Sequence, residues 1–113
     1  MLNVTTEGYA TAGGDTVEVI FAAPAKPSRW SIGGIVAGYD TGAAIAGGEL
    51  IVYDGSDSAG NIVWSITLND DQRFISIIPA EPVKFRPGRS VHIKLLNSGA
   101  SVGKISVLGY KLV

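Results

Sequence analysis

The sequence predicts an all-β protein, a two-sheet β-sandwich that is jelly-roll-like and has about eight antiparallel strands. Fifteen glycines and five prolines interrupt the 113 residues at short intervals. The runs between them are rich in Val, Ile, Thr and aromatic residues, which is typical of strands, and none keeps an apolar period of 3.6 residues. Short strands without helices bury their apolar faces by packing as two sheets. An immunoglobulin-like sandwich is the second candidate.

The expected strands follow one another along a single domain, residues 1–113. The stretch "NIVWSITL", residues 61–68, alternates most clearly and has one uniformly apolar face. "TVEVIF" and "SVHIKLL" alternate in the same way. "ELIVYD" and "RFISII" are apolar on both faces, which predicts strands covered on both sides. The strands are expected near residues 3–9, 15–22, 29–38, 48–54, 61–68, 73–78, 89–96 and 102–112.

Three further stretches carry expectations of their own. "PAEPVKFRPG" contains three prolines, which cannot donate to a strand ladder, so it is expected to be an edge crossing or a long corner. "DTGAAIAGG" is expected to be a loop of small residues, with Ile45 as a candidate contact with a partner. The polar, glycine-bearing residues 1–14 could form an arm that orders on a neighbouring subunit.

The composition indicates a protein that binds other protein. Apolar residues make up 46% of the chain and charged residues 17%, against about 25% charged residues in a typical domain. Some apolar surface is therefore expected to be buried against another chain, most simply in a homo-oligomer. A net charge of −1 and scattered basic residues argue against nucleic acid and against membrane surfaces. No signal peptide is recognised at the start and there is no cysteine, which fits a protein that is not secreted.

The stretch "VYDGSDSAGNIVW" has the oxygen ligands of a calcium loop but not its spacing. Asp54, Asp57 and Asn61 offer three ligands, whereas calcium takes six to eight and an EF-hand closes with a glutamate at its twelfth position. A hairpin turn accounts for the same residues, with Gly55 and Gly60 at positive φ and the two aspartates bound to nearby backbone amides. We expect a turn, with a weak cation site as the alternative.

No catalytic, metal or cofactor site can be assembled, so we expect no enzyme. His92 is the only histidine and alternates outward in its strand, without an identifiable nucleophile or carboxylate partner. Asp70 and Asp71 are neighbours on a hairpin tip, where two carboxylates diverge. "IGGIVAG" lacks the spacing of a phosphate loop and is expected to mark close strand packing or a bulge.

Aromatic residues are the remaining candidates for recognition. Trp64 is in register with Ile62 and Ile66 and is expected in the core. Trp30 begins a strand and is expected in the core or an interface, with a ligand platform as the alternative. The candidate interface residues are Trp30, Tyr39 and Ile45, and a carbohydrate- or receptor-binding module could use Trp30, Tyr39 or Tyr53 as a platform.

The order of stretches from residue 29 onward resembles a known group of proteins. The order is "RWSIGGIVAG", "GGELIVYDGSDSAGNIVWSITL", "FISIIPAEPVKFRPGRSVHIKLL" and "GKISVLGYKLV". A strand that closes on "YDG", a hairpin, a proline-bounded segment that ends in "PG" and a final strand with "V-x-G-Y" follow one another. This pattern resembles small all-β virion proteins of tailed bacteriophages, namely capsid decoration (cement) proteins and related head or tail-fibre modules.

The resemblance implies a structural protein without catalytic activity. Such a protein would be a homotrimer that binds the major capsid protein on the outer surface of the capsid and stabilises it. It would be made in the host cytoplasm and become part of the virion, without a cofactor. The alternative within the same group is a carbohydrate- or receptor-binding sandwich of a phage tail or fibre.

Overall fold

The computed structural model describes residues 3–13, 16–40, 48–68, 74–81, 83–96 and 102–112, and for 3–13 only the backbone. This part of the chain contains nine strands and one short 3₁₀ helix, η1 (Ala59–Asn61). The strands are β1 (Asn3–Gly13), β2 (Val17–Phe21), β3 (Arg29–Tyr39), β4 (Gly48–Asp54), β5 (Ile62–Leu68), β6 (Phe74–Ile77), β7 (Val83–Lys84), β8 (Val91–Leu95) and β9 (Val102–Leu112).

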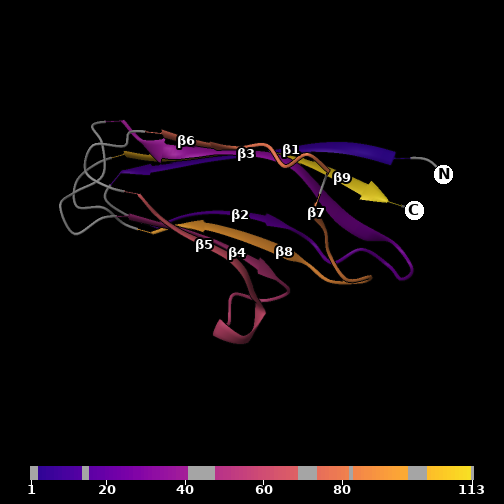
Figure 1. Cartoon of the computed structure of the whole chain (residues 1–113). Coiled ribbons are helices and arrows are strands. Elements are labelled where there is room, and N and C mark those ends of the chain that lie inside the picture. Colours follow the sequence, from indigo (N-terminus) through magenta and orange to yellow (C-terminus); the bar gives the residue numbers. More distant parts are fainter. Residues whose placement is uncertain are drawn as a thin grey trace.

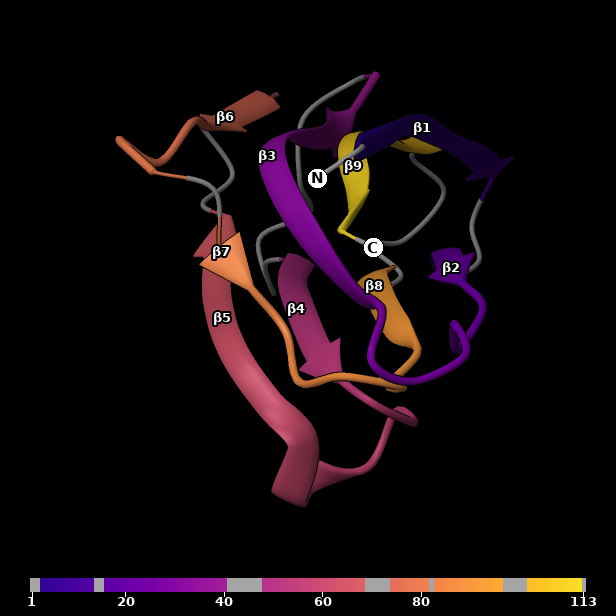
Figure 2. The ribbon, with the colours of Figure 1, turned by 90° about the vertical axis from the view of Figure 1, so that its right-hand side faces the viewer.

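The strands form two antiparallel sheets that face each other (Figure 1). Sheet A has the order β1-β9-β3-β6, and the two-residue strand β7 pairs with β3 beyond this path. Sheet B has the order β2-β8-β4-β5. Figure 2 shows β5, β6 and β7 at one side of the sandwich, while β1 and β2 lie at the other. The prediction of an all-β, two-sheet sandwich is confirmed.

The pairing has the pattern of a long hairpin wound into two layers. β4 pairs with β5 across the short loop, β3 pairs with β6, β2 pairs with β8, and β1 pairs with β9. Counted from the innermost pair outward, these four pairs lie alternately in sheet B and sheet A. The nested pairs therefore form both layers of the sandwich. With β7 set aside, eight strands in two sheets of four are the jelly-roll arrangement that the sequence predicts.

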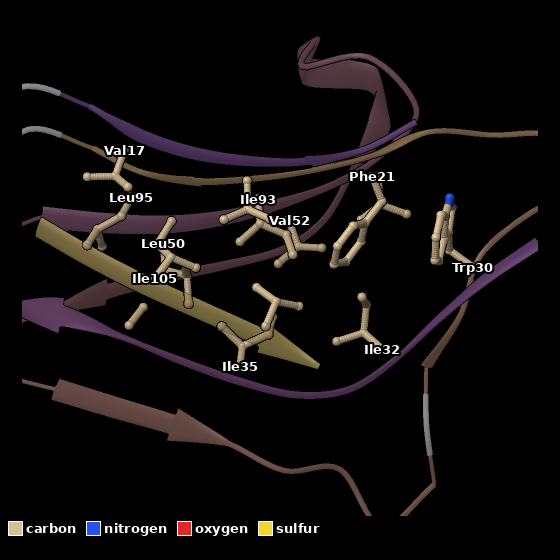
Figure 3. Packing of buried hydrophobic residues seen from close by; sticks show 14 of the residues in the cluster. Val17, Phe21, Trp30, Ile32, Ile35, Leu50, Val52, Ile93, Leu95 and Ile105 are labelled. Carbon is tan, nitrogen blue, oxygen red and sulfur yellow. The ribbon is translucent and has the colours of Figure 1, made fainter. Parts of the chain in front are cut away.

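The core lies between the sheets and is built from alternate residues of the strands (Figure 3). β8 shows the rule, since Val91, Ile93 and Leu95 are fully buried while His92 and Lys94 face outward. At one end the Phe21 and Trp30 rings stack with centroids 4.9 Å apart. β4 is covered on both faces, as predicted.

A bulge in β3 changes which residues face the core. The register with β9 shifts between Ile32 and Gly34. Trp30 and Ile32 are buried before the shift, and Ile35 and Ala37 are buried after it, so the core-facing positions change from even to odd residue numbers. A Cβ on Gly33 would lie 2.7 Å from the Tyr110 ring. The prediction of a bulge with close packing in "IGGIVAG" is confirmed.

The prediction that "RFISII" is covered on both sides is wrong. Phe74 is 50% exposed and Ile78, just after β6, is 77% exposed. The cause is position, because β6 ends its sheet and the described residues place no layer over its outer face. The apolar residues that suggested a buried strand therefore form surface.

The N-terminal residues join the sandwich. Residues 3–13 form β1, which pairs with β9 over eleven residue pairs from Asn3↔Leu112 to Gly13↔Val102. This pairing lies within the chain's own sheet, in contrast to the free arm considered for residues 1–14. A contact of this segment with a neighbouring subunit stays a prediction.

Candidate functional site

The loop between β4 and β5 is held by ion pairs. The Asp54 side chain is 10% exposed, and its Oδ2 accepts a hydrogen bond from Arg86 Nε at 2.7 Å. Arg89 Nη2 donates to the Asp54 carbonyl at 2.9 Å and to Asn61 Oδ1 at 3.1 Å. Gly55 has φ +118°, and a Cβ there would lie 2.9 Å from Arg89 Cζ. The two arginines thus tie the loop to the segment before β8.

This arrangement disfavours a cation in the loop. Asp54 already faces two guanidinium groups, whose positive charge would repel a metal ion. Asp57 pairs with Lys94 Nζ at 2.9 Å, and this hydrogen bond and charge lower the pKa of Asp57. Among the described residues, no three His, Cys, Asp or Glu side chains gather as metal ligands.

The turn is confirmed, but some of its details differ. Asp54 and Asp57 bind basic side chains, Asp57 in addition to a backbone hydrogen bond, and only Gly55 of the two glycines has positive φ. Asn61 closes the loop by donating to the Ser56 carbonyl at 2.9 Å. Sequence spacing could not show the arginines, which lie about thirty residues further along the chain.

Asp54→Ala is expected to lower the free energy of unfolding by about 2 kcal/mol. The substitution removes the carboxylate that faces the two arginines, which would remain beside the Asp54 carbonyl without a negative charge. Both arginines reach solvent, which keeps the loss below that of a fully buried pair. Urea unfolding followed by circular dichroism measures the change. The matched control is Asp57→Ala in the exposed pair, which should leave the midpoint almost unchanged. An unaltered midpoint for Asp54→Ala would contradict the assigned role.

His92 lies on the outer face of sheet B, as expected from its alternation. Its Nδ1 is 3.4 Å from Glu18 Oε2 on β2, and the side chain is 18% exposed. Glu18 is thus a carboxylate partner that the sequence did not indicate, and the pair joins β2 to β8 across the sheet surface. Asp70 and Asp71 lie outside the described residues, so their expected turn stays a prediction.

The sandwich itself buries Trp30 and Tyr39, so Trp30 lies in the core, one of the two places expected for it, and Tyr39, a candidate interface residue, is covered by the chain's own residues. Trp30 is 8% exposed, stacks on Phe21 and donates from Nε1 to the Ala22 carbonyl at 2.7 Å. Tyr39 is 1% exposed, and its hydroxyl donates to the Leu96 carbonyl. Tyr53 is also buried, which removes it as an exposed platform. Ile45 lies outside the described residues.

The outer face of sheet A carries three of the six large apolar side chains that are exposed among the described residues, while the other three, Ile20, Ile62 and Val63, belong to sheet B. Val36 is 44% exposed, Phe74 50% and Ile78 77%. In the register, Val36 opposes Ser76 and Gly38 opposes Phe74, so these residues share one face of the sheet. We call Val36, Phe74 and Ile78 the sheet A patch.

A shallow hollow of about 260 Å³ adjoins the sheet A patch. Gly33 and Gly34, at the bulge of β3, are among the residues that line it. Val36, Ile78 and Leu108 stand around it. The described residues thus bring an apolar hollow and an apolar patch together on one face. The sequence indicated this place by the adjacent glycines before "IV". Only the strand register shows on which face of the sheet the hollow lies.

Comparison with solved structures identifies similar folds. A chain from the acid-stable capsid of Helicobacter pylori bacteriophage KHP30 has a TM-score of 0.58 at 12% identity, covering 98% of this chain and 92% of that one. A Bacillus endospore appendage protein, from a family of disulfide-linked pili, has a TM-score of 0.56 at 11% identity over 98% and 88%. The K3 cleaved adhesin domain of Lys-gingipain from Porphyromonas gingivalis W83 has 0.57 at 9% identity over 90% and 73%.

These likenesses show the fold alone, given such low identity. No family model matches the chain, and no curated protein matches it. The sandwich is thus shared with a capsid protein, a pilus protein and an adhesin domain. In the part of the chain that the structure describes, no helix is long and apolar enough to cross a membrane.

Proposed function

We propose that the protein is a virion structural protein, a capsid decoration (cement) protein that binds the major capsid protein on the outer surface of a bacteriophage capsid. The sheet A patch is the observation that carries the proposal. Three large apolar side chains are exposed on one face beside an apolar hollow. Exposed apolar surface of this kind is typical of sites where another protein binds. The fold of the KHP30 capsid chain and the order of the sequence stretches support the same class.

The proposed contact needs no chemistry beyond burial. A side chain of the capsid protein would enter the hollow over Gly33 and Gly34, while Val36 and Ile78 pack around it. Each large apolar side chain that leaves water contributes about 1.5–3 kcal/mol at most. Repetition of the contact over a symmetric shell multiplies its stabilising effect. The protein would be made in the host cytoplasm and end in the virion, without a cofactor or catalytic activity.

The residues considered as the platform of a carbohydrate- or receptor-binding module are not exposed. Trp30, Tyr39 and Tyr53 are all buried, and stacking on a sugar needs an exposed ring. Phe74 is the large exposed aromatic side chain of the described residues, and it lies within the sheet A patch. A contact with another protein explains the exposure of Phe74 and also that of Val36 and Ile78.

Co-sedimentation with emptied capsids of the phage that encodes the protein tests the proposal. The wild type should sediment with the capsids, and Val36→Lys/Ile78→Lys should bind about tenfold or more weakly, because two charges would enter an apolar contact. The matched control is Ile20→Lys, which changes a 53% exposed residue on the other sheet and should bind as the wild type does.

Absence of capsid binding by the folded wild type would overturn the decoration role. Equal binding of Val36→Lys/Ile78→Lys and the wild type would overturn the sheet A patch as the contact. Circular dichroism of each variant verifies that the sandwich is intact. Both substituted side chains are surface-exposed, so folding should be retained.

A further inference from the structure

We infer that β5 is the edge by which two copies of the chain join, through antiparallel pairing of β5 with β5 of the second copy. β5 ends sheet B, so one side of its backbone has no strand partner among the described residues (Figure 2). An edge strand offers a row of unpaired N–H and C=O groups, and another extended strand satisfies them. The inference is independent of the proposed capsid role, since it concerns a different edge of the molecule.

β5 lacks most of the features that protect edge strands from pairing. Its seven residues, "IVWSITL", include no charged residue and no proline. One protective feature is present, a bulge at Val63, where the register with β4 shifts. The bulge lies near the start of the strand and leaves Trp64–Leu68 as a regular ladder against β4.

The other described edges are less suited to self-pairing. β2, at the opposite end of sheet B, has five residues and carries Glu18. At the two ends of sheet A, β1 carries Glu7 and β6 has only four residues. In a twofold pair each edge meets its own sequence, so a carboxylate in the strand would approach its own copy. The uncharged β5 has no such repulsion, which favours a second copy as its occupant.

The regular part of β5 is self-complementary. A twofold axis at Ile66 places Ser65 opposite Thr67 of the second copy, and Trp64 opposite Leu68 of the second copy. Ser–Thr pairs form hydrogen bonds across strands and aromatic–aliphatic pairs pack, each contributing to sheet stability. Ser65 and Thr67 are exposed on the outer face, while Trp64 and Ile66 are only half-buried on the inner face. The second strand would cover the part of Trp64 and Ile66 that now faces water.

The nearest described charge on β4 does not oppose this pairing. Glu49 lies one strand further in and accepts a hydrogen bond from Ser65 Oγ at 2.7 Å. Three strand spacings would separate the two copies of Glu49, about 14 Å, which exceeds the screening length of about 8 Å at physiological salt. The joined sheet would run through both molecules as eight strands, from β2 of one copy to β2 of the other.

Light scattering on the full chain tests the inference. The wild type should have the mass of two 11.7 kDa chains. Ser65→Lys/Thr67→Lys places two like-charge pairs across the axis and should raise the dissociation constant about 100-fold, giving monomers. Ser65→Lys/Thr67→Glu places a lysine opposite a glutamate in both pairs and should remain a dimer. Val36→Lys/Ile78→Lys, on the other sheet, is the control and should also remain a dimer.

A cysteine cross-link gives a second measurement that does not depend on the charged variants folding. The chain has no cysteine, so Ile66→Cys introduces a single thiol at the proposed axis. Mild oxidation should then yield a disulfide-linked dimer on a non-reducing gel, whereas Ile20→Cys on β2 should not.

Three results would overturn the inference: a monomeric or trimeric wild type, a dimer that survives Ser65→Lys/Thr67→Lys, or no cross-linked dimer in the Ile66→Cys variant. A trimer would agree with the resemblance to decoration proteins and not with β5 self-pairing. Failure of capsid binding leaves these outcomes unaffected, so the two proposals are tested separately.

Discussion

Gly48→Ala is expected to lower the free energy of unfolding by about 3 kcal/mol. Gly48 begins β4 and lies against the Tyr39 ring, so a Cβ at residue 48 would come within 2.6 Å of Tyr39 Cε2. The ring cannot move aside easily, because Tyr39 is 1% exposed and its hydroxyl is bound to the Leu96 carbonyl. Urea or thermal unfolding measures the loss.

Gly60→Ala is the matched control for Gly48→Ala. Gly60 lies in η1 and does not have positive φ, and a Cβ added to it would have no atom within 4 Å. The free energy of unfolding should therefore stay within about 0.5 kcal/mol of the wild type. Equal stability of the two variants would contradict the close packing of Gly48 on Tyr39.

Stability is expected to fall between pH 10 and pH 12 because of Tyr39. Burial raises the pKa of Tyr39 to about 12, from an ordinary value near 10. In this range the unfolded chain releases the phenolic proton before the folded chain does, so the unfolded state is favoured as the pH rises. The stabilisation is complete below pH 10 and declines by about 2 kcal/mol by pH 12.

Tyr39→Phe isolates this contribution from the titration of the lysines. At pH 8 the variant should be less stable than the wild type by about 1 kcal/mol, because it lacks the hydrogen bond to the Leu96 carbonyl. Near pH 12 the order should reverse, since phenylalanine has no proton to lose. Urea unfolding at both pH values measures the difference, and a constant difference would contradict the raised pKa.

The sequence predicts the fold because local patterns determine it. Alternation in Val91–Leu95 and in residues 64–68 assigns the inner face, although the bulge at Val63 takes Ile62 out of this pattern, and the glycines and prolines mark most turns. The class follows, since such strands have to form two layers. The hairpin at residues 55–61 could also be predicted, because its residue types are those of turns.

The candidate surfaces depend on pairing between distant residues, which the local pattern does not contain. "RFISII" and "ELIVYD" are similarly apolar, yet β4 lies inside its sheet and β6 at the end of its own. Trp30 and Tyr39 are aromatic residues at the two ends of β3, and only the second sheet shows that both are covered. Asp54 contacts Arg86 because β8, the strand that follows Arg86, pairs with β4. Sequence spacing alone therefore could not identify these contacts.

The position of β9 has a consequence for how the protein is made. β9 follows all the other described strands in chain order, yet it lies between β1 and β3 in the middle of its sheet. Until β9 emerges, β1 has no strand partner among the described residues, and the core lacks Ile105 and Val107. Synthesis from the N-terminus therefore cannot complete this layer step by step. β1 therefore has to wait for β9, and during that interval its unpaired backbone is open to chaperones or to misassociation.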